Sequence, residues 1–173
     1  MGGLSCAAVE NADLRLLRAM RTRLHTPRME EAMRVLGRAG NNGAVWFGLN
    51  IVLALADPSN RESWLICAAL GPLAIGVNYA VKLLVRRPRP HLGEGLPPLG
   101  GAPSSLSFPS AHASSSFAVA TAMTRVDGLA ALAFLLAFAL SLGRPYLGMH
   151  YPSDVLAGAA LGVALGLLVP LSI

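Results

Sequence analysis

The sequence predicts an all-α, membrane-embedded bundle of about five transmembrane helices, preceded by amphipathic helices at its N-terminus. Two features of composition predict it: hydrophobic residues make up 54% of the 173 residues, and charged residues only 13%. A soluble domain of this size carries about a quarter charged residues. The third observation is a succession of uncharged apolar stretches, each near the length that crosses a hydrocarbon core about 30 Å thick. The chain is long enough for one domain, 1–173.

Residues 10–40 are expected to form two amphipathic helices that lie along the membrane surface. The first covers 11–24, with leucines and a methionine on one side and arginines on the other. The second begins with Thr26 as its N-cap and Pro27 at its first position, and Gly40 is a natural stop. The alternative is an ordinary helical hairpin that packs on the bundle.

Five apolar stretches follow, and each is interpreted as a transmembrane helix, because backbone groups in lipid must form hydrogen bonds within their own segment. They run over 39–56, 63–81, 108–124, 128–143 and 155–173. Small residues recur at 157–166, AGAALGVALG, which suits close contact between helices. A soluble bundle with short buried helices is the competing interpretation. The segment 82–107 is rich in Pro and Gly and is predicted to be a long functional loop.

If the five spans alternate in direction, the polar residues that could bind a ligand or take part in catalysis all fall on one face of the membrane. These residues are Lys82, Arg89, Ser110, Ala111, His112, Arg144, His150 and Asp154. Random polar helix ends would not be expected to gather in this way. The expectation depends on the number of spans, and it fails if one of them is not real.

The basic residues predict the orientation and the kind of partner. Twelve of the 14 lysines and arginines fall on the side of these polar residues, and only Arg61 and Arg125 fall on the other. The positive-inside rule then places the candidate site toward the cytoplasm, in the inner membrane of a bacterial cell. The net charge of +5 does not indicate a nucleic-acid partner, because charge density and aromatic content are low. Anionic membrane lipids or an anionic substrate fit better, and the oligomeric state stays unknown.

Three of the gathered residues are cations. Lys82, Arg89 and Arg144 would repel one another unless an anion lay between them. Arginine forks match phosphate oxygens in paired hydrogen bonds. Each cation alone would be interpreted as a side chain that extends toward the membrane interface. Together with two histidines and an aspartate, they indicate a phosphate site.

The stretch FPSAHASSS, 108–116, opens the third span. The free N–H groups and the positive dipole end of a helix make such a place an anion site, to which Ala111 would contribute its backbone. The hydroxyl of Ser110 can add a donor, and His112 is placed to give a proton to a leaving oxygen. The alternative is a serine N-cap beside an interfacial histidine.

His150 and Asp154 are four residues apart at the start of the last span. The carboxylate can accept a hydrogen bond from one imidazole nitrogen, which fixes the tautomer and leaves the other nitrogen free to attack. A phosphohistidine would form, and water would hydrolyse it. Two histidines and an aspartate could instead bind zinc, but three surrounding cations disfavour a metal. No metal and no cofactor is expected.

These residues resemble the type 2 phosphatidic acid phosphatase (PAP2) superfamily, which shares its core with vanadium haloperoxidases. The resemblance spans about 63–173, the expected catalytic core. Three motifs carry it, in the right order: Lys82 to Arg89-Pro90, then Pro109-Ser110-Ala111-His112, then Gly143-Arg144 with His150 and Asp154. Two positions depart from the family pattern. Ala111 replaces a glycine, which matters only if that position needs a positive φ, and Gly143 replaces a serine hydroxyl.

The resemblance implies a metal-independent phosphomonoesterase or pyrophosphatase that acts on lipid phosphates. In the implied roles, His150 attacks, Asp154 orients it and His112 protonates the leaving group. The phosphate would be held by Lys82, Arg89, Ser110, Ala111 and Arg144.

The short chain and the basic N-terminal helices look most like family members that remove the 5-phosphate from a polyprenyl-linked phosphoribose during cell-wall arabinan synthesis. Several alternatives stay open. Within the same class they are a polyprenyl diphosphate phosphatase, or a phosphatidic acid or phosphatidylglycerophosphate phosphatase. Outside it they are a vanadate-dependent haloperoxidase-like enzyme and a non-enzymatic membrane protein.

Overall fold

The computed structural model describes residues 2–93, 96, 98–99 and 106–172, and within these residues it contains helices and no strand. The helices are α1 (Gly2–Arg23), α2 (Pro27–Ala39), α3 (Ala44–Ala56), α4 (Arg61–Val85), α5 (Ala111–Val126), α6 (Leu132–Tyr146) and α7 (Pro152–Leu168). Short 3-10 turns lie at Asn41–Gly43, Pro58–Asn60 and Gly128–Ala131. The all-α prediction is confirmed, and each of the five apolar stretches corresponds to one helix, α3 to α7.

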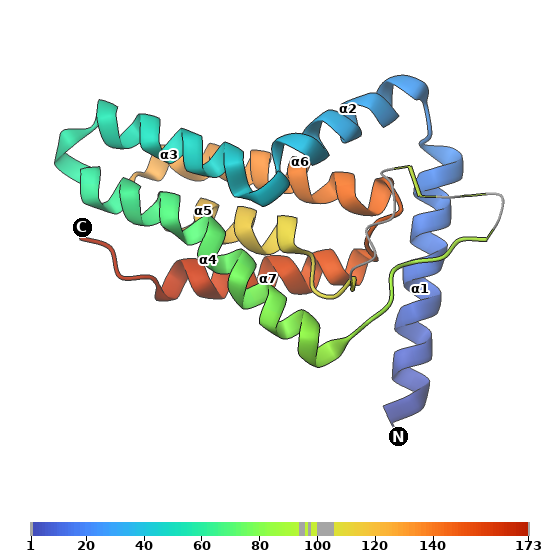
Figure 1. Cartoon of the computed structure of the whole chain (residues 1–173). Coiled ribbons are helices and arrows are strands. Elements are labelled where there is room, and N and C mark those ends of the chain that lie inside the picture. The colour runs from blue at the N-terminus through green and yellow to red at the C-terminus, as the bar shows by residue number, and fades with distance from the viewer. Residues whose placement is uncertain (1, 94–95, 97, 100–105, 173) are drawn as a thin grey trace.

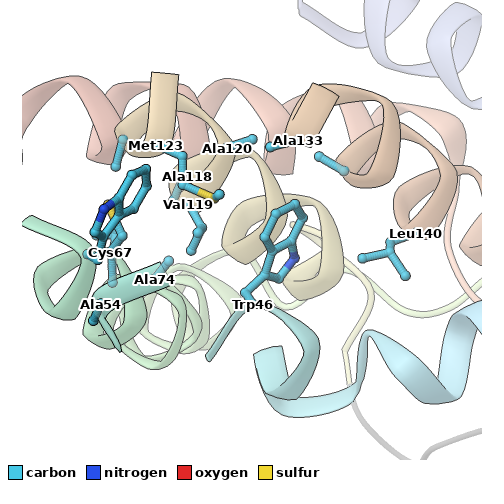
Figure 2. Close-up of a cluster of buried hydrophobic side chains, with 14 residues drawn as sticks. Trp46, Ala54, Cys67, Ala74, Ala118, Val119, Ala120, Met123, Ala133 and Leu140 are labelled. Carbon is cyan, nitrogen blue, oxygen red and sulfur yellow. The ribbon is translucent and has the colours of Figure 1, made fainter. Parts of the chain in front are cut away.

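α5 is the central helix, and it packs against α4, α6 and α7 (Figure 1). Most of its buried residues are alanines and serines, which let three neighbours approach its backbone. Larger side chains from the surrounding helices fill the remaining space, and Figure 2 shows Ala118 and Ala120 of α5 in the same cluster as Trp46 and Leu140. The indole N–H of Trp46 donates a hydrogen bond to Ser116 Oγ (2.9 Å), so this buried polar group is satisfied.

α7 lies against α5 along a stripe of three glycines, Gly158, Gly162 and Gly166. A Cβ atom on these residues would stand 2.6, 2.4 and 2.5 Å from backbone carbonyl oxygens of α5. The two backbones are therefore in direct contact, at the small-residue pattern that the sequence shows. This contact brings the N-terminal ends of α5 and α7 next to each other.

Replacement of Gly162 by alanine is expected to lower the free energy of unfolding by about 1–3 kcal/mol, because the added methyl group would meet rigid backbone 2.4 Å away. Gly76→Ala on α4 is the matched control, since no atom lies within 4 Å of its added Cβ. The control is expected to be neutral or stabilising by up to about 1 kcal/mol. Thermal unfolding in detergent, followed by circular dichroism, measures both. Equal behaviour of the two variants would contradict the close α5–α7 contact.

By length and composition, the helical segment Pro58–Val85 could cross a membrane. α2 and Asn41–Ala56 together could form a second span, broken by a bend of 49°. α6 and α7 are apolar but shorter. The number of helices that cross the bilayer therefore stays a prediction.

At three helix ends, the difference between the structure and the prediction brings a site residue into a helix. α4 continues to Val85, so Lys82 lies in its last turn and not in the loop. α6 continues to Tyr146 and includes Arg144, and α7 begins at Pro152 with Asp154 in its first turn. The helices extend because these polar side chains point into the bundle and are buried there.

The two N-terminal helices cover the same end of the bundle (Figure 1). Thr26 caps α2 as predicted, since its Oγ1 accepts a hydrogen bond from the Met29 N–H (3.2 Å). α2 packs on α6, and α1 contacts α6 and α7. α1 begins earlier than the predicted residue 11, and it buries two charged residues, Asp13 and Arg21. The prediction that the arginines lie on the outer side of this helix is therefore wrong for Arg21.

Candidate active site

The C-terminal ends of α4 and α6 meet the N-terminal ends of α5 and α7 at one end of the bundle (Figure 1). The alternating helix directions place the eight predicted site residues at this end. All of them lie in these helix ends or in the segments beside them: Lys82, Arg89, Ser110, Ala111, His112, Arg144, His150 and Asp154.

Three cations are close enough to interact electrostatically, since the charge of Lys82 is influenced by those of Arg89 and Arg144. Lys82 and Arg144 are each only 7% exposed. The ammonium of Lys82 donates to the carbonyl oxygens of Leu106 (2.9 Å) and Ser107 (3.3 Å). The Nε of Arg144 is buried and makes no hydrogen bond with the described residues. A buried cation without a hydrogen-bond partner is unfavourable, so this cluster is suited to an anion.

Arg89 connects the segment after α4 to the loop before α7. Its Nη1 donates to the carbonyl oxygen of Met149, and the same atom lies 3.4 Å from Nε2 of His150. Burial lowers the pKa of Arg89, and the charge of Asp154 partly offsets this effect. The guanidinium is thus held beside the imidazole nitrogen that would attack.

His150 and Asp154 face each other across the start of α7. Nδ1 of His150 is 3.6 Å from Oδ2 of Asp154, which is longer than a hydrogen bond. Oδ2 also accepts the Tyr151 N–H (2.8 Å), so the carboxylate caps α7 as well. Burial, together with the charges of the nearby cations, lowers the pKa of His150 to about 4, although Asp154 opposes the shift. The imidazole is therefore neutral at pH 7, the form that a nucleophile requires.

Ser110 and Ala111 begin α5. The N–H of Ser110 is not free, because it donates to the carbonyl oxygen of Asp154 (2.9 Å), which differs from the expectation of a free N–H there. Its hydroxyl is buried and has no hydrogen-bond partner among the described residues. Ala111 does not have a positive φ, so this position does not require the glycine of the related motif.

His112 is positioned by α2. Its Nε2 lies 3.1 Å from the carbonyl oxygen of Gly37, which can only accept, so Nε2 carries the hydrogen. A Cβ on Gly40 would stand 2.8 Å from Cδ2 of His112, and one on Gly37 would stand 3.1 Å from Nη1 of Arg144. Two glycines therefore let α2 lie directly on the site. Sequence reasoning did not place α2 here, although Gly37 and Gly40, three residues apart, were a possible signal.

Gly143, one of the two departures from the related motifs, faces α2. A Cβ on Gly143 would be 3.5 Å from the carbonyl oxygen and the sulfur of Met33, which is ordinary contact distance. These contacts do not explain why a glycine replaces the serine of the related motif.

Two further charged residues that sequence reasoning did not single out are linked to Asp154, Arg87 directly and Asp13 through Arg87. Nη1 of Arg87 donates to Oδ1 of Asp154 (2.7 Å), and Nη2 donates to Asp13 of α1 (2.9 Å). The sequence gives little indication that Asp13 belongs to the site, because an acidic residue in an arginine-rich helix is typical of a solvated surface.

A cavity of about 390 Å³ opens beside Arg144, between α2 and the α6–α7 loop. Its lining consists of Arg34, Gly37, Arg38, Asn41, Arg144, Leu147 and Met149. Arg34 and Arg38 are paired with Glu30 and Glu31. Because neither glutamate lines the cavity, its wall carries three arginines and no carboxylate.

The zinc alternative was considered against the side chains that could coordinate a metal. In the described part of the chain, no three His, Cys, Asp or Glu side chains come together as a metal site.

The comparisons with known proteins cover most of the chain. Residues 62–173 match the family model of the PAP2 superfamily. A protein of Mycobacterium tuberculosis named decaprenylphosphoryl-5-phosphoribose phosphatase is 40% identical over 143 residues, which are 83% of this chain and 80% of that protein.

Two solved structures share the fold. A PAP2-type phosphatidylglycerolphosphate phosphatase from Bacillus subtilis superimposes with a TM-score of 0.73 at 24% identity, over 93% of this chain and 84% of that one. A bacterial vanadium-dependent iodoperoxidase gives a TM-score of 0.71 at 18% identity, over 91% of this chain and 48% of that one. The predicted similarity to haloperoxidases thus holds at the level of fold.

Proposed function

Because the chain belongs to the PAP2 superfamily, we propose that it is a metal-independent phosphatase that removes a phosphate group from a lipid-linked substrate. One observation carries the proposal: Arg144 Nε and Ser110 Oγ are buried, without hydrogen bonds to the described residues, in a cluster of cations that faces a neutral imidazole. A phosphate group would supply the missing charge and the missing acceptors.

In the proposed reaction, the phosphate lies between Lys82, Arg89 and Arg144, with the Ser110 hydroxyl as a further donor. Nε2 of His150 attacks phosphorus, and the bond from phosphorus to the leaving oxygen breaks. The electron pair of that bond goes to the leaving oxygen, which takes the Nδ1 proton of His112; this residue acts as an imidazolium beside the bound phosphate dianion, while its Nε2–H stays on the Gly37 carbonyl.

The second step regenerates the enzyme. Water gives a proton to His112 and attacks phosphorus, and the bond from phosphorus to Nε2 breaks to release inorganic phosphate. Asp154 stabilises the imidazolium that exists while the phosphohistidine forms and breaks down. Its 3.6 Å separation from Nδ1 is expected to shorten when phosphate binds.

We propose further that the substrate is decaprenylphosphoryl-5-phosphoribose. The relative with 40% identity over 83% of this chain carries that substrate in its name. Such a molecule has two phosphate groups, the 5-phosphate to be removed and the one that joins ribose to the lipid. Arg144, which is proposed to hold the phosphate that is removed, also lines the 390 Å³ cavity, so the rest of the substrate would extend into this cavity. Arg34 and Arg38 would then lie near the second phosphate.

The proposed location is a bacterial cell membrane, with the site on the cytoplasmic side. The whole chain, 1–173, would form one domain, of which 63–173 is the catalytic core. The basic residues near the site, which the positive-inside rule retains in the cytoplasm, support this orientation.

Phosphate release from a panel of lipids tests the proposal. The panel contains decaprenylphosphoryl-5-phosphoribose, a polyprenyl diphosphate, phosphatidic acid and phosphatidylglycerophosphate, each with the purified protein in detergent. We expect the highest kcat/KM for the phosphoribose lipid. A preference for the diphosphate would refute the proposed substrate, and no release from any lipid would refute the phosphatase.

The double variant Arg34→Gln/Arg38→Gln is expected to raise KM for the phosphoribose lipid by roughly tenfold, since it removes two charges from the wall that faces the second phosphate. The rise should be smaller for phosphatidic acid, which has one phosphate. Arg28→Gln, an exposed change on the same helix, is the control for charge. Equal effects on both substrates would show that the two arginines do not recognise the second phosphate.

A further inference from the structure

We infer that Asp13 of α1 and Arg87 are positioning residues of the active site, which together hold the carboxylate of Asp154 in the orientation that faces His150. The inference rests on the proposed function, because it adds two residues to the same site. Asp13 lies outside the segment 62–173 that matches the family model, so α1 would be part of the catalytic apparatus of this protein.

Arg87 bridges two carboxylates with its two terminal nitrogens. Nη1 donates to Oδ1 of Asp154 (2.7 Å), and Nη2 donates to Oδ2 of Asp13 (2.9 Å). The guanidinium carbon also lies 3.9 Å from the centroid of the Tyr151 ring, a cation–π contact. A planar group held at both ends and on one face has a fixed orientation.

Asp13 in turn is held by the first turn of α7. Its Oδ1 accepts the Ser153 N–H (3.0 Å), and its Oδ2 accepts the Ser153 hydroxyl. The N–H groups of a first helical turn have no partners within the helix, so a carboxylate from α1 satisfies one of them. Asp13 is only 5% exposed, and a buried carboxylate needs such partners.

These contacts leave Asp154 little freedom to rotate. Its Oδ1 is bound by Arg87, and its Oδ2 is bound by the Tyr151 N–H and faces Nδ1 of His150. A chain of polar groups therefore runs from α1 to the nucleophile, in the order Asp13, Arg87, Asp154 and His150.

The same chain sets the electrostatic balance at His150. Burial lowers the pKa of Arg87, but the hydrogen bond that it donates to Asp13 and the charge of Asp154 outweigh this effect and raise the pKa, so the guanidinium stays charged. Asp13 compensates much of that charge, which leaves the charge of Asp154 available to the imidazole. The other charged or titratable groups that act on His150 are Arg89, Lys82, Arg144 and His112.

The experiment compares Asp13→Asn and Arg87→Met in the purified full chain, with the substrate that gives the highest rate. Both variants are expected to lower kcat by about 10- to 100-fold, because a displaced Asp154 no longer orients the nucleophile. KM should change by less than about threefold, since neither residue is placed against the phosphate.

The acid limb of the pH profile of kcat/KM should move in opposite directions in the Asp13→Asn and Arg87→Met variants. Loss of the Asp13 charge leaves Arg87 uncompensated, which disfavours imidazolium at His150 and moves the limb to lower pH. Loss of Arg87 leaves the charge of Asp154 uncompensated, which favours imidazolium and moves the limb to higher pH. A residue that only stabilises the fold would change the amount of folded enzyme without these shifts.

Matched controls lie next to each residue. Glu10→Gln on α1 and Arg86→Met beside Arg87 alter exposed side chains and should leave kcat and the acid limb unchanged. Arg87→Lys keeps the charge, and its acid limb should lie nearer to that of the wild type than the limb of Arg87→Met. If Asp13→Asn does not fold, this comparison of the two Arg87 variants decides the question.

Acid limbs that stay in place, or that move in the same direction in both charge-removing variants, would overturn the inference. An active wild type with unaffected variants would refute the positioning role alone. A wild type that releases no phosphate from any lipid would instead refute the proposed function. The two failures are therefore distinguishable.

Discussion

Replacement of His150 by alanine is expected to abolish phosphate release, with a fall in kcat of at least about 10⁴-fold. The reason is that Nε2 of this neutral, buried imidazole is the atom proposed to attack phosphorus. The cations would still bind phosphate in the variant, so KM should change far less than kcat. The variant therefore separates binding from chemistry.

The measurement is a single turnover with a substrate labelled at the phosphate to be removed. In the wild type, quenching in alkali should capture the label on the protein, because phosphohistidine is stable in base and labile in acid. The His150→Ala protein should remain unlabelled. His91→Ala, a change in an exposed histidine, is the control for fold and handling. Label on the His150→Ala protein, or more than about a tenth of wild-type turnover, would eliminate the proposed nucleophile.

The second large effect is expected at His112. His112→Asn should lower kcat for the phosphoribose lipid by about 10²- to 10⁴-fold, the range for loss of a general acid. The leaving group there is a sugar hydroxyl, which departs poorly unless it is protonated. The carbonyl oxygen of Gly37 fixes the orientation of the imidazole (3.1 Å to Nε2), so the ring is preorganised for this transfer.

A second substrate makes the interpretation specific. With p-nitrophenyl phosphate, whose leaving group needs no proton, the His112→Asn variant should lose much less activity in the formation of the phosphohistidine. Burst kinetics with this substrate separate that step from hydrolysis by water. Equal losses with both substrates in the first step would indicate that His112 only holds the phosphate.

The sequence predicted the helices because their signals are local. An uncharged stretch such as 63–81 indicates a helix wherever the rest of the chain goes, and the structure has one at each predicted place. The predicted site residues also meet at one end of the bundle, because alternate helix directions bring their ends together. Their catalytic roles stay predictions.

The contacts that sequence reasoning missed are long-range. Asp13 binds Ser153, which is 140 residues away in the chain, and no local pattern distinguishes it from a solvated acidic residue. The position of α2 depends on Gly37 and Gly40, whose meaning appears only once His112 and Arg144 lie beside them. The occupied N–H of Ser110 is a similar case, because its acceptor belongs to Asp154 of another helix.

The glycine stripe of α7 has a consequence for how this scaffold can change. His112, the proposed acid, and Asp154, which orients the nucleophile, lie at the adjoining ends of two helices whose backbones touch, so no side chain between these helices can be enlarged or trimmed to change their spacing. Variation in substrate must then come from α2, which lies on the site and lines the cavity beside Arg144. A protein engineer who wanted a different leaving group would change residues of α2 and keep the α5–α7 pair unchanged.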